Sequence, residues 1–291
     1  MEIQIPLILF TSFLAWAGGT FAAQGVLAIK KEGAKIQMTA LIVSFIILVL
    51  GGILVLFHLA RPLHIFNGFG NPTSGITQEL VAIILIGIWM VVYFVMIRQS
   101  NDGSVPAWCG IVAIVLALVL DAVMSHSYMM AARPTWNTVL QVLSIIGASC
   151  AAGPATVMAV AAFKGEKIEL LKPLVLWGAI IGLLTTAIYL VAMCFMGGSF
   201  IDLGNYFDPT HPNYGITTGS DVNIFSDSLS IAFSIVALVG CVLSVVAALL
   251  AKAKEDKQKL CSIVAVVGAV AAAIALRVVF YILGQAVLLF Y

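Results

Sequence analysis

The sequence predicts an all-α, polytopic membrane protein with eight transmembrane helices in a single domain that covers residues 1–291. The chain has 62% hydrophobic and 9% charged residues, whereas soluble domains have about 45–50% apolar and about 25% charged residues. Its mean hydropathy is +1.14. The apolar residues form unbroken runs of about 20 or more, the length of a membrane-spanning helix. Such runs exclude the alternating pattern of a membrane β-barrel.

Eight apolar runs are long enough to cross a bilayer. Because lipid offers no hydrogen-bonding partner to the backbone, each crossing is expected to be a helix. The first run is predicted to be a permanent helix rather than a cleavable signal, because Lys30 and Lys31 follow it and no basic segment precedes it. The expected helices cover residues 5–29, 36–60, 77–97, 106–130, 137–163, 172–196, 228–251 and 260–290.

The distribution of basic residues predicts that both termini face outward. Lys and Arg favour the connections on the cytoplasmic side of a membrane. Of the 14 basic residues, 11 belong to four connections on one side, at positions 30–35, 98, 164–172 and 252–259. Only Arg61 and Arg133 belong to the other side, and Arg277 lies within the last predicted helix.

Polar residues gather where the second apolar run ends and the third begins. His58, Arg61 and His64 follow one another closely there, and Glu79 is expected to begin the next helix. His58 and Arg61 share a helix face if the 36–60 helix extends that far, and the short 61–76 connection is expected to bring Glu79 near His58. Imidazoles and a carboxylate at this boundary can take up protons from a lipid-soluble carrier. The alternative for Glu79 is simple stabilisation by the helix dipole.

Three further ionisable residues lie within the apolar runs, where charge is costly and marks functional positions. Asp121 and Arg277 are expected at similar depth when the helical rise is counted. They are therefore predicted to form a buried pair in an intramembrane polar network that includes His126. The alternative is that Arg277 faces the head group of a ligand.

The sequence gives little indication of a bound metal or cofactor. The five cysteines are dispersed in the apolar runs, with no C-x-x-C spacing, and are expected to be small buried side chains. We expect no metal or covalently bound cofactor, and a net charge of +1 without a basic tail gives no indication of nucleic-acid binding. One haem ligated by His58 and His126 is kept as an alternative.

The long outward connection 197–227 has a composition of its own. It has 31 residues, no Lys or Arg, and four aspartates, and its 205–215 tract is rich in turn-forming and aromatic residues. Because long connections of this kind are often functional, we expect it to dock a partner at the outer face. The alternative is that it only caps its own helices.

The segment F-H-L-A-R-P-L-x-x-F-N at positions 57–67, with Glu79 heading the next helix, resembles the membrane anchor subunits of dimethyl sulfoxide reductases, the DmsC family. It is more distantly similar to the polysulfide reductase/NrfD class of quinol-interacting subunits. The family commonly has Gly where this chain has Ala60. The family's functional His and Glu correspond to His58 and Glu79, and His64 stands where a basic residue is often seen.

The resemblance implies a multi-pass anchor in the bacterial inner (cytoplasmic) membrane that serves anaerobic respiration. Such a subunit holds a molybdopterin catalytic subunit and a four-cluster iron–sulfur subunit at the outer face. It binds menaquinol as its substrate, passes electrons to the iron–sulfur partner and releases protons outward. Any enzymatic activity would belong to the assembled complex only.

The residues and the resemblance lead to one mechanism. Glu79 and His58 are the predicted catalytic residues, and they bind the quinol together with Arg61 and His64. Glu79 accepts a proton, and His58 hydrogen-bonds a quinol oxygen. Arg61 keeps Glu79 ionised or binds the partner or a lipid head group. The alternatives are a structural scaffold and a secondary transporter with a path through Asp121, Arg277 and Glu79. A transporter would favour midplane sites on broken helices.

Overall fold

Eight long helices make up the part of the chain that the computed structural model describes, which is residues 4–59, 61–196 and 222–285. No strand occurs in these described residues. All eight are long and apolar enough to cross a membrane. They are α1 (Ile5–Lys30), α2 (Ala34–Leu56), α3 (Gly75–Gln99), α4 (Ala107–Ser127), α5 (Val139–Lys164), α6 (Leu171–Cys194), α7 (Ser228–Ala253) and α8 (Gln258–Leu283).

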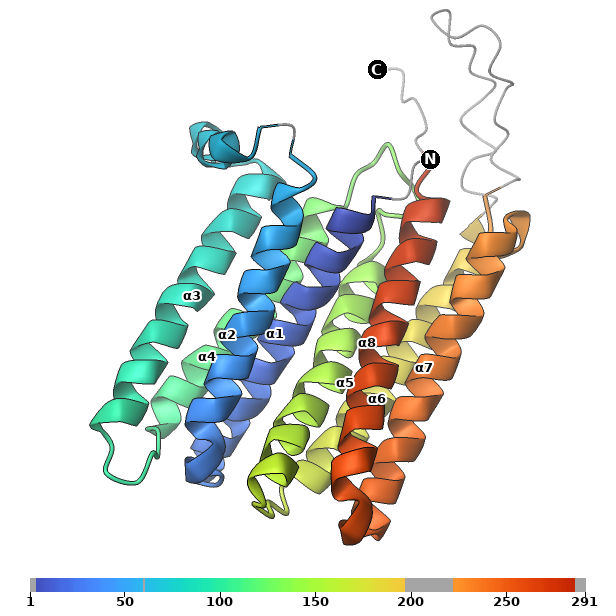
Figure 1. Cartoon of the computed structure of the whole chain (residues 1–291). Helices are drawn as coiled ribbons and strands as arrows, with labels where there is room; N and C mark the ends of the chain where they lie inside the picture. The colour runs from blue at the N-terminus through green and yellow to red at the C-terminus, as the bar shows by residue number, and fades with distance from the viewer. Residues whose placement is uncertain (1–3, 60, 197–221, 286–291) are drawn as a thin grey trace, which may run out of the picture.

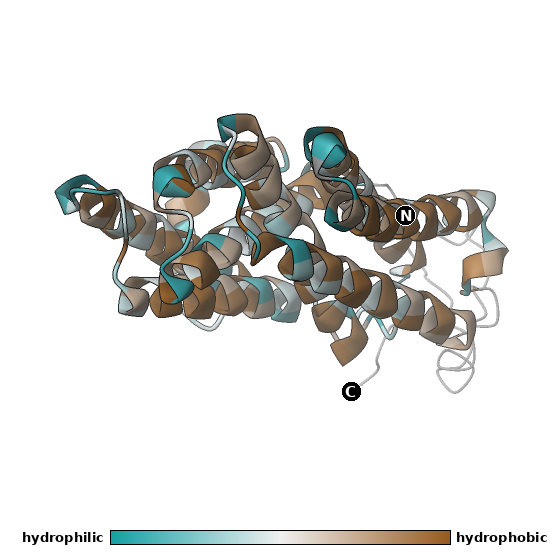
Figure 2. Ribbon diagram, turned by 90° about the horizontal axis from the view of Figure 1, so that it is seen from below, coloured by the Kyte–Doolittle hydropathy of each residue, from teal (hydrophilic) through white to brown (hydrophobic). Residues whose placement is uncertain are grey.

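The helices run up and down, so that α1 begins and α8 ends at the same end of the bundle (Figure 1). We call this end the terminal face and the other end the opposite face. The terminal face carries the connections 57–74 and 128–138. The opposite face carries four short connections, at 31–33, 100–106, 165–170 and 254–257, and all of them except 100–106 contain lysine. Figure 2, seen from the opposite face, shows hydrophilic residues at the connections of that face and mostly hydrophobic residues along the helices, as expected for a chain solvated by lipid.

Each half of the chain repeats one packing pattern. In the first half α1 packs on α2 and α4, and α3 packs on α4; in the second half α5 packs on α6 and α8, and α7 packs on α8. The halves join mainly through α1 and α5. A methyl group on Gly153 of α5 would lie 2.1 Å from the carbonyl carbon of Gly19 on α1. Helices in lipid approach this closely only where small residues allow it.

The observed helix bounds agree with the expected ones to within a few residues, with four informative differences. Helix α2 ends at Leu56 rather than residue 60, because its last turn tightens into i→i+3 hydrogen bonds such as His58 N to Val55 O (3.0 Å). Arg61 leaves the helical conformation (φ −136°, ψ 82°), as expected before a proline, and a 3₁₀ helix, η1 (Pro62–Gly70), follows. This 3₁₀ helix was not predicted.

The other three differences concern α3, α4 and α8. Helix α3 begins at Gly75 rather than residue 77, so Glu79 is its fifth residue instead of its third. Helix α4 ends at Ser127 instead of residue 130, and α8 ends at Leu283 instead of residue 290. Most of the 197–227 connection, including three of its four aspartates, lies outside the described residues. Its described end holds a short 3₁₀ helix, Ile224–Ser226, and Asp227 caps α7 by accepting from Leu229 N (2.9 Å).

Candidate functional site

Glu79 lies in a buried position between α3 and α4, near the terminal face. Its side chain is only 8% exposed, and Oε1 accepts a short hydrogen bond from the Ser127 hydroxyl at the end of α4. The helices can meet there because residue 75, one turn earlier on α3, is glycine: a methyl group at Gly75 would lie 2.6 Å from Cβ of Ser127. Gly75 therefore sets the separation at which Glu79 reaches its partner.

Substitution of Gly75 tests this positioning. We expect Gly75→Ala to lower the stability of the purified protein by about 1–3 kcal/mol, because the added methyl forces α3 away from α4. The measurement is the thermal unfolding midpoint in detergent. Gly87→Ala is the matched control, because it adds the same methyl to the same helix where no heavy atom lies within 4 Å. Equal midpoints for the two variants would contradict the close approach.

Arg277 on α8 is a buried cation and a candidate electrostatic partner for this carboxylate. Its side chain is 5% exposed. Nε donates to Oγ1 of Thr11 (2.9 Å), and Nη1 donates to Oε1 of Gln141 (3.0 Å). The guanidinium also lies over the rings of Phe280 (4.6 Å) and Tyr128 (5.1 Å). Its positive charge also interacts electrostatically with the Glu79 carboxylate.

Aromatic residues of the 128–138 connection close this cluster against the end of α8. Trp136 Nε1 donates to Phe280 O (2.7 Å), and its ring stacks on Phe280 at 4.6 Å between centroids. Arg133 donates to Gly284 O and lies over the Trp136 ring at 4.5 Å. Burial raises the pKa of the Tyr128 phenol well above its ordinary value, with the neighbouring Tyr281 and Glu79 adding to the effect. Tyr128 therefore remains a neutral hydroxyl beside the carboxylate.

His58, Arg61 and His64 are all exposed at the terminal face. His64 Nδ1 lies 3.2 Å from Nδ2 of Asn67. Among the residues that the structure describes, no hydrogen bond or ion pair joins His58 or Arg61 to Glu79. The 3₁₀ helix η1 is nevertheless tied to α3, because the Thr77 hydroxyl donates to Gly68 O (2.6 Å). His64 lies in η1, His58 lies between α2 and η1, and Glu79 lies near the start of α3, so the histidines and the carboxylate share one end of the bundle without a hydrogen bond or ion pair between them in the described chain.

The expected pairing of Asp121 with Arg277 is not observed. In the described part of the chain no ion pair joins them, and Arg277 binds Thr11 and Gln141 instead. Both helices start at the opposite face, where Asp121 is the fifteenth residue of α4 and Arg277 the twentieth of α8. Five residues of helical rise correspond to about 7–8 Å in depth. The prediction of similar depth was therefore wrong. The expected helix starts at residues 106 and 260 put the two residues within two positions of the same depth, whereas the observed starts at 107 and 258 separate them by five.

His126, the third member of the predicted network, is exposed near the end of α4. His58 is exposed as well, so these two histidines do not face each other across a buried interior. The structure thus separates the predicted residues into the buried Glu79, an exposed basic rim that consists of His58, Arg61 and His64, and the deeper Asp121, which within the described residues interacts with Ser149 and not with Arg277.

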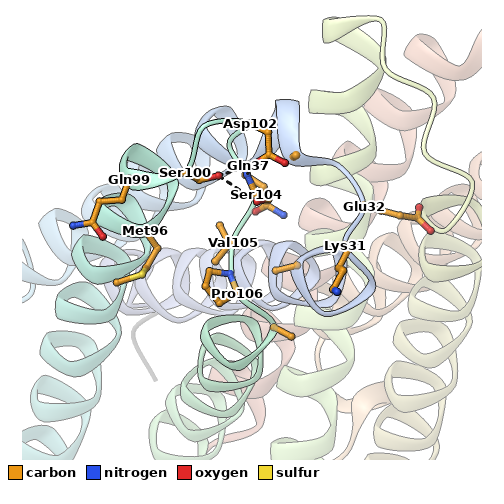
Figure 3. A pocket seen from close by; sticks show the side chains of 13 residues that line it. Lys31, Glu32, Gln37, Met96, Gln99, Ser100, Asp102, Ser104, Val105 and Pro106 are labelled. Carbon is orange, nitrogen blue, oxygen red and sulfur yellow. Dashed lines mark hydrogen bonds between the residues drawn. The ribbon is translucent and has the colours of Figure 1, made fainter.

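The opposite face contains a cavity of about 560 Å³, lined by the ends of α1 to α4 and their connections (Figure 3). Its polar groups already bind one another. Ser100 Oγ (2.6 Å) and Ser104 N (2.9 Å) donate to the Asp102 carboxylate, and these hydrogen bonds hold the pKa of Asp102 well below its usual range. Tyr93 donates to Oε1 of Gln37 (3.0 Å) beneath. Such satisfied groups offer a ligand little, so the cavity is a weaker candidate than the Glu79 cluster.

The profile of the DMSO reductase anchor subunit (DmsC) family matches residues 1–283, which is nearly the whole chain. The chain belongs to the DmsC family. A search of curated proteins gave no significant match. Family membership and the eight apolar helices together make this anchor subunit a multi-pass membrane protein of a DMSO reductase-type complex.

The residues that bind Glu79 and Arg277 are not apparent from the sequence. Ser127, Gln141 and Thr11 hold Glu79 and Arg277 in place. Small hydroxyl residues in an apolar helix usually bond their own backbone, as Thr11 also does with Leu7 O (2.9 Å), so they give no distinct signal. Gln141 could have been found, because an amide within a membrane span is costly unless it is paired.

Proposed function

We propose that this anchor subunit oxidises menaquinol beside Glu79, at the terminal face of α3 and α4. The observation that carries the proposal is the buried Glu79 carboxylate, which accepts a hydrogen bond from Ser127 and interacts electrostatically with Arg277. The exposed residues His58, Arg61 and His64 lie at the same end of the bundle, where η1 is tied to α3 by the hydrogen bond from Thr77 to Gly68 O. A base in such a position can accept protons from a substrate that arrives through the lipid.

The proposed chemistry gives each residue one task. Oxidation of a quinol releases two electrons and two protons. The Glu79 carboxylate accepts a hydroxyl proton, and Arg277 stabilises that carboxylate before the proton arrives. Ser127 orients the carboxylate through its hydrogen bond. His58 accepts the proton of the second quinol hydroxyl and releases it to the aqueous side. His64 and Arg61 bind the head group from the same side.

The two electrons of the quinol need an acceptor, which we assign to a partner subunit because the chain belongs to a family of anchor subunits. We propose that an iron–sulfur subunit, together with a molybdopterin catalytic subunit, docks on the terminal face. The exposed aromatic residues Phe57 and Phe66 support a contact surface there, since their side chains are 75% and 62% exposed. The lysine-rich connections of the opposite face support an outward orientation of the terminal face in the bacterial cytoplasmic membrane.

Substitution of His58 in the assembled complex tests the proposed rim. We expect His58→Ala to lower quinol-supported turnover about tenfold to a hundredfold, because a hydrogen bond to the reacting quinol is lost. Turnover with a soluble reductant that feeds the iron–sulfur subunit directly should remain unchanged. His126→Ala, which removes another exposed imidazole of the same bundle, is the control. Equal quinol-supported turnover of the two variants would refute the proposed role of His58 in quinol binding.

A further inference from the structure

A second cavity lies at the middle of the bundle and is not used by the proposed reaction. It has a volume of about 210 Å³ and is bordered by α1, α4, α5 and α6. Asp121 of α4 forms part of its wall. Because Asp121 precedes Ser127 by six residues, the cavity is about 9 Å deeper than the Glu79 site along the helix axis. The two sites are therefore separate.

The Asp121 carboxyl group is a buried polar group in need of a partner. Its side chain is 1% exposed, and among the described residues its Oδ1 has no hydrogen-bond partner. The Ser149 hydroxyl on α5 interacts with the same carboxyl group. A carboxyl oxygen buried at membrane depth is costly without a hydrogen bond. A donor that enters the cavity would remove this cost.

The remainder of the cavity wall is almost entirely apolar and opens toward the lipid. Trp177 and Leu118 border it, and their side chains are 62% and 46% exposed on the membrane-facing surface. An apolar cavity of about 150 Å³ can remain dry and bind an aromatic ring such as benzene. The size and lining of this cavity therefore favour a ring that arrives from the bilayer over a chain of water molecules.

We propose that this cavity binds a lipid-soluble molecule whose aromatic ring carries a hydroxyl group. The ring occupies the apolar space beside Trp177, and the hydroxyl donates to Oδ1 of Asp121. Quinols from the membrane pool and long-chain phenols share this chemistry. The site is a binding site, independent of electron transfer at Glu79.

Photolabelling of the full-length protein in lipid nanodiscs tests the proposal. The probe is an alkylated 2-naphthol that carries a diazirine, and the matched control probe is the same molecule without the hydroxyl. The naphthol should label the α4 and α6 segments that contain Leu118 and Trp177. Asp121→Leu should weaken naphthol binding about tenfold, which corresponds to one lost hydrogen bond, and should leave binding of the control probe nearly unchanged. Asp121→Asn, which keeps an acceptor oxygen, should retain the naphthol.

Two further variants keep the test independent of folding and of the Glu79 site. Leu118→Trp fills the mouth of the cavity from its lipid-exposed side and should abolish labelling even if Asp121→Leu does not fold. Glu79→Gln should leave this labelling intact, so that failure of the quinol-oxidation proposal is seen separately. Labelling that is absent from α4 and α6, or unaffected by both Asp121→Leu and Leu118→Trp, would overturn the proposal.

Competition identifies the source of the ligand. Displacement of the naphthol by menaquinol or by a redox-inactive alkylphenol supports the proposed chemistry and shows which pool the cavity serves. Displacement by neither compound would overturn the assignment of a hydroxyl-bearing ring.

Discussion

Glu79→Gln is expected to lower quinol-supported turnover of the assembled complex by about a hundredfold or more, the usual contribution of a positioned base. The amide keeps the size of the side chain and can still accept from Ser127, but it cannot take up a proton. Because the variant does not alter the partner subunits, turnover with a soluble reductant should stay near the wild-type rate. The measurement is the ratio of the two activities in one preparation.

Glu32→Gln is the control for Glu79→Gln, because it makes the same change at an exposed position on the opposite face. It should leave both activities unchanged. If Glu79→Gln lowered both activities equally, the residue would serve assembly of the complex, and its role as a proton acceptor would be refuted.

Arg277→Met is expected to destabilise the protein by about 2–4 kcal/mol, because hydrogen bonds to a charged group contribute about 1.5–3 kcal/mol each. Methionine fills much of the same space but leaves Oε1 of Gln141 without its donor and removes the cation from the Phe280 and Tyr128 rings. The thermal unfolding midpoint in detergent should fall. Quinol-supported turnover should fall as well, since Glu79 loses the nearby positive charge.

Arg98→Met provides the matched comparison, because Arg98 is exposed at the end of α3 on the opposite face. Its midpoint should stay at the wild-type value. Arg277→Lys should rescue Arg277→Met only in part, because an ammonium group lacks the planar fork that reaches Thr11 and Gln141 together. A midpoint for Arg277→Met that equals the wild-type value would show that the cluster around Arg277 does not stabilise the fold.

The eight helices could be predicted from sequence because a bilayer imposes a length and an apolar composition on every crossing. Their ends were harder to place. The last turn of α2 tightens before Arg61 and Pro62, and apolar residues such as Leu59 continue past the end of the helix, so hydropathy gives no signal there. The same reasoning applies to α8, whose apolar run extends beyond Leu283.

The candidate site could be predicted only in part. Glu79 stands out in sequence as a carboxylate beside an apolar run, but its partner Ser127 comes from α4 and depends on the close approach at Gly75. The partners of Arg277 likewise come from α1 and α5, and no local pattern encodes them. Which helices pack together is set by small residues at crossings, such as Gly19 and Gly153. A pattern of apolar runs does not reveal these crossings.

The most direct test of the account is a structure of the assembled complex with a bound, non-oxidisable menaquinol analogue. We predict that one oxygen of its head group lies about 2.6–3.2 Å from the Glu79 carboxylate, at hydrogen-bonding distance for a proton acceptor, with His58 near the second oxygen. A head group seen only at the opposite face, or one that leaves Glu79 uncontacted, would contradict the account.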